Sequence, residues 1–424
     1  MSKIKKVPVG WRKERLDHLA KIQTGIAKNQ NHQAEVITVP YLRVANVQDG
    51  YLDLSEIKEI EVPKDKAGRY MVQIGDVLLT EGGDFDKLGR GAVWEGQIIN
   101  CIHQNHVFVV RANQETLSPS FFSAQAGSSY GKRYFLQCSK QSTNLASINS
   151  SQIKAFPVLF PPLTEQKAIA DMLTVWDEAI EKVERLIQAK EKQLRQISMR
   201  LLFGQKRLDN QFNELADGQF FKYPSDWELI RIGKVAKEVS LRKAEPEVVV
   251  LSCSKYDGFI NSLDYFGKQV FSSDTSNYKV VTKGQFGYPS NHVEEGSIGL
   301  LEHCEKGIVS PIYVVFETSR EKVHPEYLYK LLKSDVYRHI FQVKTSSSVD
   351  RRGSLRWSEF SKIKVLLPSL EEQKQISETL FSAKQEIDLL KQLAEQHKTQ
   401  KRGLMQKMLT GQWRVKPDVV KRYE

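Results

Sequence analysis

Apolar residues recur at alternating spacings of four and three along two long stretches of the chain. Such a heptad pattern is typical of a helix that pairs with another helix through a narrow apolar seam. The two seams are in phase, which predicts that the helices pair as a coiled coil. The predicted seam residues are Ile169, Leu173, Trp176, Ile180, Val183, Ile187 and Leu194 in the first stretch, and Ile376, Leu380, Ile387, Leu390 and Leu404 in the second.

One polar residue interrupts each seam at an equivalent place, Lys190 in the first helix and His397 in the second. A single polar seam residue can fix the register of two helices at some cost in stability. Alternatively, both side chains extend to solvent while their carbon atoms stay on the seam. The sequence leaves both interpretations open.

The two predicted helices belong to an internal repeat. The segment that begins at Pro8 reappears 216 positions later at Pro224, and the segment that begins at Pro161 reappears 207 positions later at Pro368. A period of about 200 residues is far longer than the period of a solenoid repeat. The chain therefore contains two copies of a unit in which a domain is followed by a long helix.

The first part of each repeat has short segments rich in Val, Ile and Tyr, such as 41–47, 76–80 and 106–111, which are typical of strands. The predicted fold class is α+β, with two mixed α/β domains separated by a long antiparallel two-helix coiled coil and related by a pseudo-twofold repeat. The predicted segments are domains 1–160 and 223–367, helices 161–208 and 368–412, a linker 209–222 and a tail 413–424.

Composition and charge narrow the choice of partner and location. The 424 residues include 62 Lys and Arg against 51 Asp and Glu, a formal net charge of +11, which favours polyanionic partners such as nucleic acid. No apolar stretch reaches the roughly 18 residues of a membrane helix, and the first residues lack the apolar core of a secretory signal. We expect a cytoplasmic protein whose four widely spaced cysteines stay reduced.

Motifs of covalent chemistry are not found in the sequence. The nearest approach to a phosphate-binding Walker loop, at 127–133, has the wrong spacing. Glu165 and Lys167, repeated as Glu372 and Lys374, have the spacing of a nuclease motif but stand in the first turn of a helix, where acidic residues complement the helix dipole. We predict no catalytic residue, no metal site and no cofactor in this chain.

Polar and basic residues gather instead in loops at equivalent places of the two domains. Glycines let the backbone approach phosphates, and Lys, Arg, Ser and Asn side chains contact phosphates and base edges. Plain turns and solvated charges are the alternatives. The candidate DNA-binding residues are Gly82, Gly83, Asp84, Lys87, Arg90, Lys140, Ser142, Thr143 and Asn144 in the first domain, and Ser290, Asn291, His292, Lys344, Ser346, Ser347, Ser348, Arg351 and Arg352 in the second.

Three motifs stand out between Pro8 and Gly411. They are the P-x-x-W phrase that opens each half, the phrase from Gly75 to Gly83, and the P-L-x-E-Q-K segment that opens both long helices. With these motifs the chain resembles the specificity subunits of type I restriction-modification enzymes. The second copy departs from the Gly75 phrase at 284–292, which suits a domain that reads a different sequence.

The resemblance implies two target recognition domains, each of which reads one half of an asymmetric, bipartite site in double-stranded DNA. It also implies that two adenine methyltransferase subunits dock on the paired helices, that restriction and motor subunits join them, and that these partners carry S-adenosylmethionine, ATP and Mg²⁺. We therefore expect a non-catalytic DNA-recognition subunit of a restriction system. The alternatives are a self-contained DNA methyltransferase or nuclease, and a coiled-coil scaffold that does not read DNA.

Overall fold

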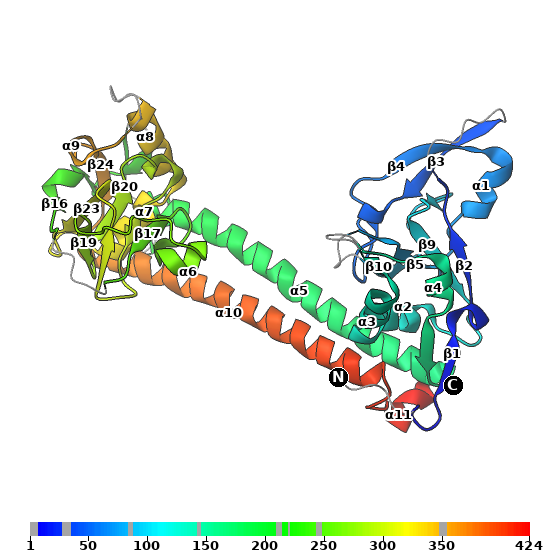
Figure 1. Cartoon of the computed structure of the whole chain (residues 1–424). Coiled ribbons are helices and arrows are strands. Elements are labelled where there is room, and N and C mark those ends of the chain that lie inside the picture. The colour runs from blue at the N-terminus through cyan, green and yellow to red at the C-terminus, as the bar shows by residue number, and fades with distance from the viewer. Residues whose placement is uncertain are drawn as a thin grey trace. The chain divides into compact units, whose positions relative to one another are not determined.

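The computed structural model describes residues 7–27, 35–83, 88–141, 146–208, 214–218, 221–242, 248–346 and 354–424 (Figure 1). The chain divides into two units. Unit 1 comprises Met1–Arg185 and Lys391–Glu424, and unit 2 comprises Leu186–Leu390. Each unit therefore contains the domain of one repeat together with parts of both long helices.

Unit 1 is built on a four-stranded antiparallel sheet in the order β2-β9-β5-β7, whose central strands β5 and β9 are almost entirely buried. Smaller sheets have the orders β4-β3-β8, β10-β11-β6 and β1-β12. The strands are β1 (Arg12–Arg15), β2 (Ala20–Thr24), β3 (Val36–Leu42), β4 (Lys58–Pro63), β5 (Val77–Thr80), β6 (Gly82–Gly83), β7 (Gly91–Val93), β8 (Ile102–His103), β9 (Val107–Ala112), β10 (Lys140–Gln141), β11 (Ala146–Ser147) and β12 (Pro157–Phe160). The short helices are η1 (Leu16–His18), η2 (Val44–Asn46), α1 (Lys64–Tyr70), α2 (Pro119–Gly127), α3 (Ser129–Cys138), α4 (Ser150–Lys154), α11 (Pro417–Val420) and η6 (Lys421–Tyr423).

Unit 2 repeats this plan with the sheet order β16-β23-β20-β21 and adds three two-stranded pairs, β13-β14, β17-β18 and β19-β22. The strands are β13 (Leu215–Asp217), β14 (Lys222–Pro224), β15 (Glu228–Arg231), β16 (Ala236–Val239), β17 (Leu251–Ser254), β18 (Gly258–Asn261), β19 (Lys279–Thr282), β20 (Phe286–Pro289), β21 (Gly299–Leu300), β22 (Lys306–Val309), β23 (Tyr313–Thr318) and β24 (Lys364–Leu367). The short helices are η4 (Ile232–Lys234), α6 (Ser262–Phe266), η5 (Val293–Glu295), α7 (Pro325–Leu332), α8 (Asp335–Ser346) and α9 (Trp357–Phe360).

The first and last strands of each domain pair with each other in the same register. Arg12 of β1 faces Phe160 of β12, and Glu228 of β15 faces Leu367 of β24. The chain therefore enters and leaves each domain side by side, and a long helix begins directly after the closing strand. These helices are α5 (Leu163–Leu202) and α10 (Leu370–Met408).

Every residue of the seam predicted from the heptad pattern is buried or half-buried. In unit 1 the ammonium of Lys401 pairs with Asp177, and that of Lys398 pairs with Glu184 at 2.8 Å. As the residue numbers increase along α5, those of the paired residues in α10 decrease. The two helices are therefore antiparallel. With two α+β domains and this helix pair, the predicted fold class is confirmed.

The two polar seam residues have different surroundings. Lys190 is one-third exposed and reaches the partner helix within unit 2, where its ammonium lies 2.8 Å from Glu386. His397 packs edge-on against the ring of Trp176 within unit 1, with 5.6 Å between ring centroids. Each polar side chain thus makes a specific contact across the helix pair, so neither simply extends to solvent.

Several sequence-based boundaries need correction. The strand expected at 41–47 ends at Leu42, because the Asn46 side chain accepts the backbone N–H of Arg43 at 2.9 Å and starts the helical turn η2. Part of the predicted linker 209–222 forms the hairpin β13-β14. The predicted tail 413–424 contains α11 and η6, and its Val415 is buried in the core of unit 1. Apolar residues in these segments find partners that local patterns do not reveal.

Candidate nucleic-acid interface

The glycine after each long helix packs against the P-x-x-W phrase of a domain. Gly411 lies on Pro8 and Trp11 in unit 1, and Gly204 lies on Pro224 and Trp227 in unit 2. Both glycines have positive φ, +68° and +66°, and an added Cβ would lie 2.5 Å and 2.3 Å from the proline rings. Only glycine fits this left-handed position at such close approach. These motif residues therefore join a helix end to a domain.

The glutamate of each P-L-x-E-Q-K segment binds an arginine of the other repeat. Glu165 accepts two hydrogen bonds of 2.7 Å from the guanidinium of Arg414 in unit 1. Glu372 lies 2.7 Å from the guanidinium of Arg207 in unit 2, and Arg207 also binds Asp226 at 2.9 Å. Glu165 is only 4% exposed. These carboxylates are occupied in ion pairs at the helix starts, which agrees with the prediction of a structural role.

The glutamine of the same segment ties the helix start to the loop before α2 or α7. The Gln166 side chain accepts the backbone N–H of Ser118 at 2.9 Å, and the Gln373 side chain accepts that of His324 at 2.8 Å. Each amide N–H₂ group donates back to two carbonyl oxygens, which include those of Pro161 and Pro368. Both amides are fully buried. The most specific motif of the sequence is thus a packing device present in both units.

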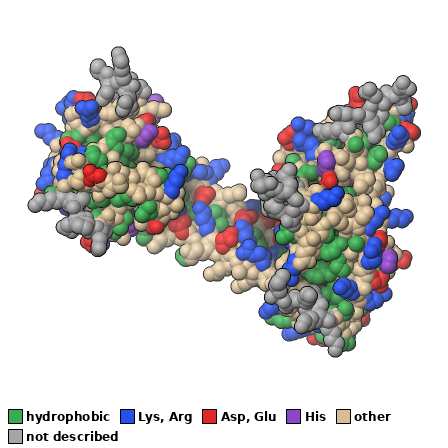
Figure 2. Space-filling model, in the orientation of Figure 1, with side chains coloured by type: hydrophobic (Ala, Val, Ile, Leu, Met, Phe, Trp, Pro, Cys, Tyr) green, Lys and Arg blue, Asp and Glu red, His purple; other side chains and the backbone are tan. Residues whose placement is uncertain are grey.

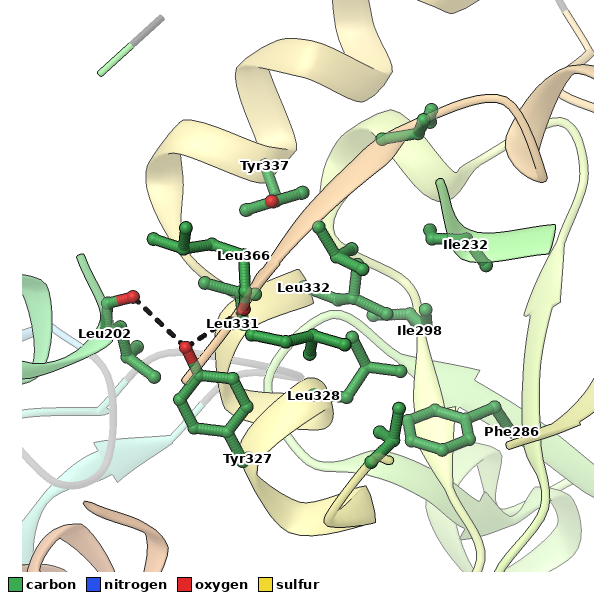
Figure 3. Close-up of a cluster of buried hydrophobic side chains, with 14 of the residues drawn as sticks. Leu202, Ile232, Phe286, Ile298, Tyr327, Leu328, Leu331, Leu332, Tyr337 and Leu366 are labelled. Atoms are coloured by element: carbon green, nitrogen blue, oxygen red, sulfur yellow. Dashed lines mark hydrogen bonds between the residues drawn. The ribbon is translucent and has the colours of Figure 1, made fainter. Parts of the chain in front are cut away.

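A buried polar group fixes the far end of each long helix, with a different residue in each unit. In unit 2 the Tyr327 hydroxyl lies 3.4 Å from the Leu202 carbonyl and 3.1 Å from the Leu366 carbonyl, amid the leucines of α7 (Figure 3). In unit 1 the Gln125 amide donates to the equivalent carbonyls of Leu409 and Leu159. In each unit one side chain thus joins the end of a long helix to the closing strand of the domain, but this side chain differs between the units.

In unit 1 the structure brings two of the predicted DNA-binding segments together. Gly82–Gly83 is a strand rather than a loop, because β6 pairs with β11, which in turn pairs with β10 and its exposed Lys140. Arg90 is half-buried and donates to the Gln48 side chain at 3.2 Å. The remaining candidates of this unit, which are Asp84, Lys87, Ser142, Thr143 and Asn144, lie outside the described residues.

In unit 2 the predicted residues are less uniform. Ser290 is only 8% exposed, which corrects the expectation of an exposed contact there. His292 is exposed, but its ring nitrogen lies 3.4 Å from Glu295, and Glu294 is also close, so a phosphate would meet negative charge at this place. Asn291 stands between Ser290 and His292 in the sequence. Lys344 is exposed on α8, and this helix ends at Ser346. Ser347, Ser348, Arg351 and Arg352 lie outside the described residues.

The Gly-Asp phrase of unit 1 has a structural role that unit 2 fills differently. Asp76 is buried and binds the guanidinium of Arg111 at 2.7 Å. At the corresponding place the Gln285 amide donates to Glu317 at 3.1 Å, and Glu317 also pairs with Lys237 at 3.0 Å. These contacts lower the pKa of Glu317. The departure of the second copy from the Gly-Asp phrase thus exchanges one ion-pair arrangement for another.

Sequence reasoning missed one element that recurs in both units, a turn around an Asp-Gly pair. Asp49 and Gly50 form it in unit 1, and Asp257 and Gly258 form it in unit 2. Both glycines have positive φ, +89° and +73°. The sequence contained a signal for this element. The two Asp-Gly pairs stand 208 positions apart, so they continue the internal repeat through a region where few other residues are identical.

The described surface carries charges of both signs. On the face shown in Figure 2, Lys and Arg side chains are interspersed with Asp and Glu over both units. On this face the basic side chains form small groups rather than one large patch, so a DNA contact must be argued from local groups. Among the described helices, none has the length and apolar character needed to span a bilayer.

Comparison with known proteins decides the family. The model of the type I restriction modification DNA specificity domain matches residues 8–191 and 224–398. The chain belongs to this family. The match confirms the resemblance seen in the motifs, and with it the expected role as a DNA specificity subunit that is not itself the catalyst.

Individual relatives match either nearly the whole chain or part of it. A Methanocaldococcus jannaschii protein named as the MjaX specificity subunit of a type I restriction enzyme is 25% identical, over 98% of this chain and 96% of its own length. The EcoKI specificity subunit of Escherichia coli K12 is 25% identical over 39% of this chain and 36% of its own. The HsdS subunit from Thermoanaerobacter tengcongensis shares the fold, with a TM-score of 0.56, 16% identity, and coverage of 96% of this chain and 98% of that one. A chain from a structure of a type I restriction-modification system has a TM-score of 0.60 at 16% identity and covers 95% of this chain and 98% of its own.

Proposed function

We propose that this specificity subunit reads an asymmetric, bipartite DNA target, with one half-site for each unit. The observation that carries the proposal is the double match to the specificity-domain family within one chain. The two units share sheet order and strand register but carry different residues in their exposed loops. Two unlike readers on a common framework suit two unlike half-sites.

The subunit supplies sequence choice, and partner subunits supply the chemistry. Two methyltransferase subunits dock on the paired helices α5 and α10, and restriction and motor subunits join this assembly. S-adenosylmethionine, ATP and Mg²⁺ belong to those partners. Lys and Arg contacts with phosphates set the affinity and its salt dependence, whereas polar side chains set specificity, at about 1 to 3 kcal/mol for a good bidentate base contact.

The test is a map of methylated adenines produced by the chain together with its methyltransferase subunits. We expect a single split sequence with unspecified bases in its middle, and we expect Arg351→Ala to relax one half of that sequence only. A methylation pattern without a split sequence would contradict the proposal. Methyl transfer by the purified chain alone, with S-adenosylmethionine and DNA, would favour a self-contained methyltransferase instead.

A further inference from the structure

The Asp-Gly turns of the two units lie beside the candidate DNA-binding loops, and they were not among the predicted sites. We propose that each turn is a DNA-contacting element, with Gln48 facing one half-site and Lys255 and Tyr256 facing the other. The proposal rests on the proposed function, because it names further residues of the surface that reads DNA.

The turn lies at the corresponding sheet edge in both units. The N–H of Gly50 donates to the carbonyl of Gly91 in β7 at 2.9 Å. In unit 2 the place of a Cβ on Gly258 lies 3.4 Å from the Cα of Gly299 in β21. Strands β7 and β21 are the corresponding edge strands of the two main sheets. Each turn therefore lies at the same edge of its sheet and contains a glycine of positive φ, which disfavours other residues. At Gly258 a Cβ would also lie 2.6 Å from the Tyr329 hydroxyl, whereas the corresponding space at Gly50 is open.

A lysine from the helical layer holds each turn a second time. In unit 1 the ammonium of Lys132, in α3, forms an ion pair with Asp49. In unit 2 Lys333, at the end of α7, donates to the carbonyl of Lys255 at 2.7 Å and to that of Gly296 at 3.0 Å. A turn that is anchored to the sheet and to a helix presents its tip in a defined position, which recognition of base edges requires.

The turn of unit 1 contacts a residue that the sequence assigned to DNA binding, and the turn of unit 2 is linked through Lys333 to the end of a neighbouring segment. In unit 1 the guanidinium of Arg90, a predicted contact, donates to the side chain of Gln48 at 3.2 Å. In unit 2 Lys333 joins the turn to Gly296, which ends the helical turn η5 directly after Asn291 and His292. Pieces of chain far apart in sequence are thus joined beside each turn, directly in unit 1 and through Lys333 in unit 2.

The exposed residues of the two turns differ, although both turns lie at the same edge of their sheets. Unit 1 presents the exposed ring of Tyr51 and half-buried Gln48, whose amide also donates to the Ala45 carbonyl at 2.7 Å. Unit 2 presents exposed Lys255, whose ammonium lies 4.9 Å from the centroid of the Tyr256 ring. Tyr256 is 75% exposed. Arg and Gln read guanine and adenine edges through bidentate contacts, and Lys contacts phosphates. A partner that both units bind in the same way would favour the same exposed residues in both turns. The exposed residues differ, which favours DNA with two different half-sites.

The experiment uses the full chain assembled with its methyltransferase subunits. The wild-type complex selects a target from random duplex DNA, and the selected duplex and versions altered in one half-site serve as probes for Kd. Gln48→Ala should lower discrimination in one half-site by about 5- to 150-fold and leave the other unchanged. Tyr256→Ala should weaken binding through the opposite half-site, and Lys255→Ala should reduce the slope of log K against log salt concentration by about one.

Matched controls are Gln97→Ala and Tyr265→Ala, which remove exposed side chains of the same types elsewhere in the same units. Unchanged Kd values for Gln48→Ala and Tyr256→Ala would overturn the proposal. An equal loss at both half-sites, or loss of methyltransferase binding, would overturn it too and would identify the turns as a protein contact. If the wild-type complex selects no sequence at all, the proposed function itself fails, before any variant is compared.

Discussion

The joints at the ends of the two long helices use the same residues but enclose them to different degrees. In unit 2 the side chain of Arg207 is 10% exposed and binds both Glu372 and Asp226. In unit 1 the side chain of Arg414 is 44% exposed and binds Glu165 and the carbonyl of Val9. Both guanidinium groups lie near the tryptophan of the P-x-x-W phrase, at 5.8 and 6.0 Å from the ring centroid. A shared motif thus fixes the geometry of a joint, and its surroundings determine how much the joint contributes to stability.

The same distinction runs through the whole molecule. Motif residues that join a helix to a domain recur in both units, as Gln166 and Gln373 do, although Gln125 and Tyr327 differ at the far helix ends. Residues within the domains are exchanged more freely, as in the replacement of the Asp76 ion pair by the Gln285 arrangement. The repeat therefore preserves the motif connections between helix and domain, while ion pairs within the domains differ between the units.

The largest expected effect comes from removing the more enclosed arginine. Arg207→Ala leaves Glu372 with an uncompensated charge that is largely withdrawn from water, so we expect the free energy of unfolding of unit 2 to fall by about 3 to 5 kcal/mol. Arg414→Ala should cost unit 1 clearly less. The side chain of Glu165 is itself only 5% exposed, but the guanidinium that covers it is 44% exposed, so removing this guanidinium lets water reach and solvate the carboxylate. Urea unfolding of the full chain, followed by hydrogen exchange resolved to each unit, measures both changes.

The control for this comparison is the double substitution Arg207→Ala with Glu372→Gln. Removing the stranded charge should restore part of the lost stability. Equal losses for Arg207→Ala and Arg414→Ala would show that enclosure does not distinguish the two joints.

A second difference between the units is a fully buried histidine in unit 1. The Nδ1–H of His103 donates to the carbonyl of Val107 at 2.7 Å, and burial lowers the pKa of His103 to about 4. In the unfolded chain the histidine takes up a proton near pH 6.5, so stability is full above that pH and falls as the pH drops toward 4. We expect unit 1 to lose about 2 kcal/mol between pH 7 and pH 5 from this group.

The measurement is urea unfolding at the two pH values, resolved to unit 1. His103→Gln keeps a hydrogen-bond donor without a titrating ring, and it should flatten the dependence of unit 1 over this range. The histidines of unit 2 are exposed or half-buried, and burial also lowers the pKa of His324, so unit 2 should lose stability in the same direction but by less than unit 1. An undiminished slope in His103→Gln would assign the effect to other groups.

The sequence predicted what depends on periodicity and repetition. The heptad pattern located the helix seam, and the repeat located both domains, because these signals extend over many residues. It could not reveal that Glu165 binds Arg414, since the partners are far apart in the chain and meet only through folding. For the same reason Gly82–Gly83 looked like a loop, although pairing with β11 makes it a strand. The Asp-Gly turns could have been predicted from the sequence, since the 208-residue offset between them nearly matches the repeat.

The smallest expected effect compares two glycines that stand eight positions apart in unit 1. Gly403 lies on the exposed face inside α10, and the place of its Cβ is free of other atoms within 4 Å. Gly403→Ala should therefore stabilise unit 1 by about 0.5 to 1 kcal/mol, because glycine loses more backbone entropy in a helix than alanine does. Gly411→Ala should have the opposite sign, since Gly411 has φ of +68° and would place its Cβ 2.5 Å from Pro8. Thermal unfolding of the two variants distinguishes these outcomes, and a loss of stability in Gly403→Ala would indicate that this part of α10 is not a regular helix in solution.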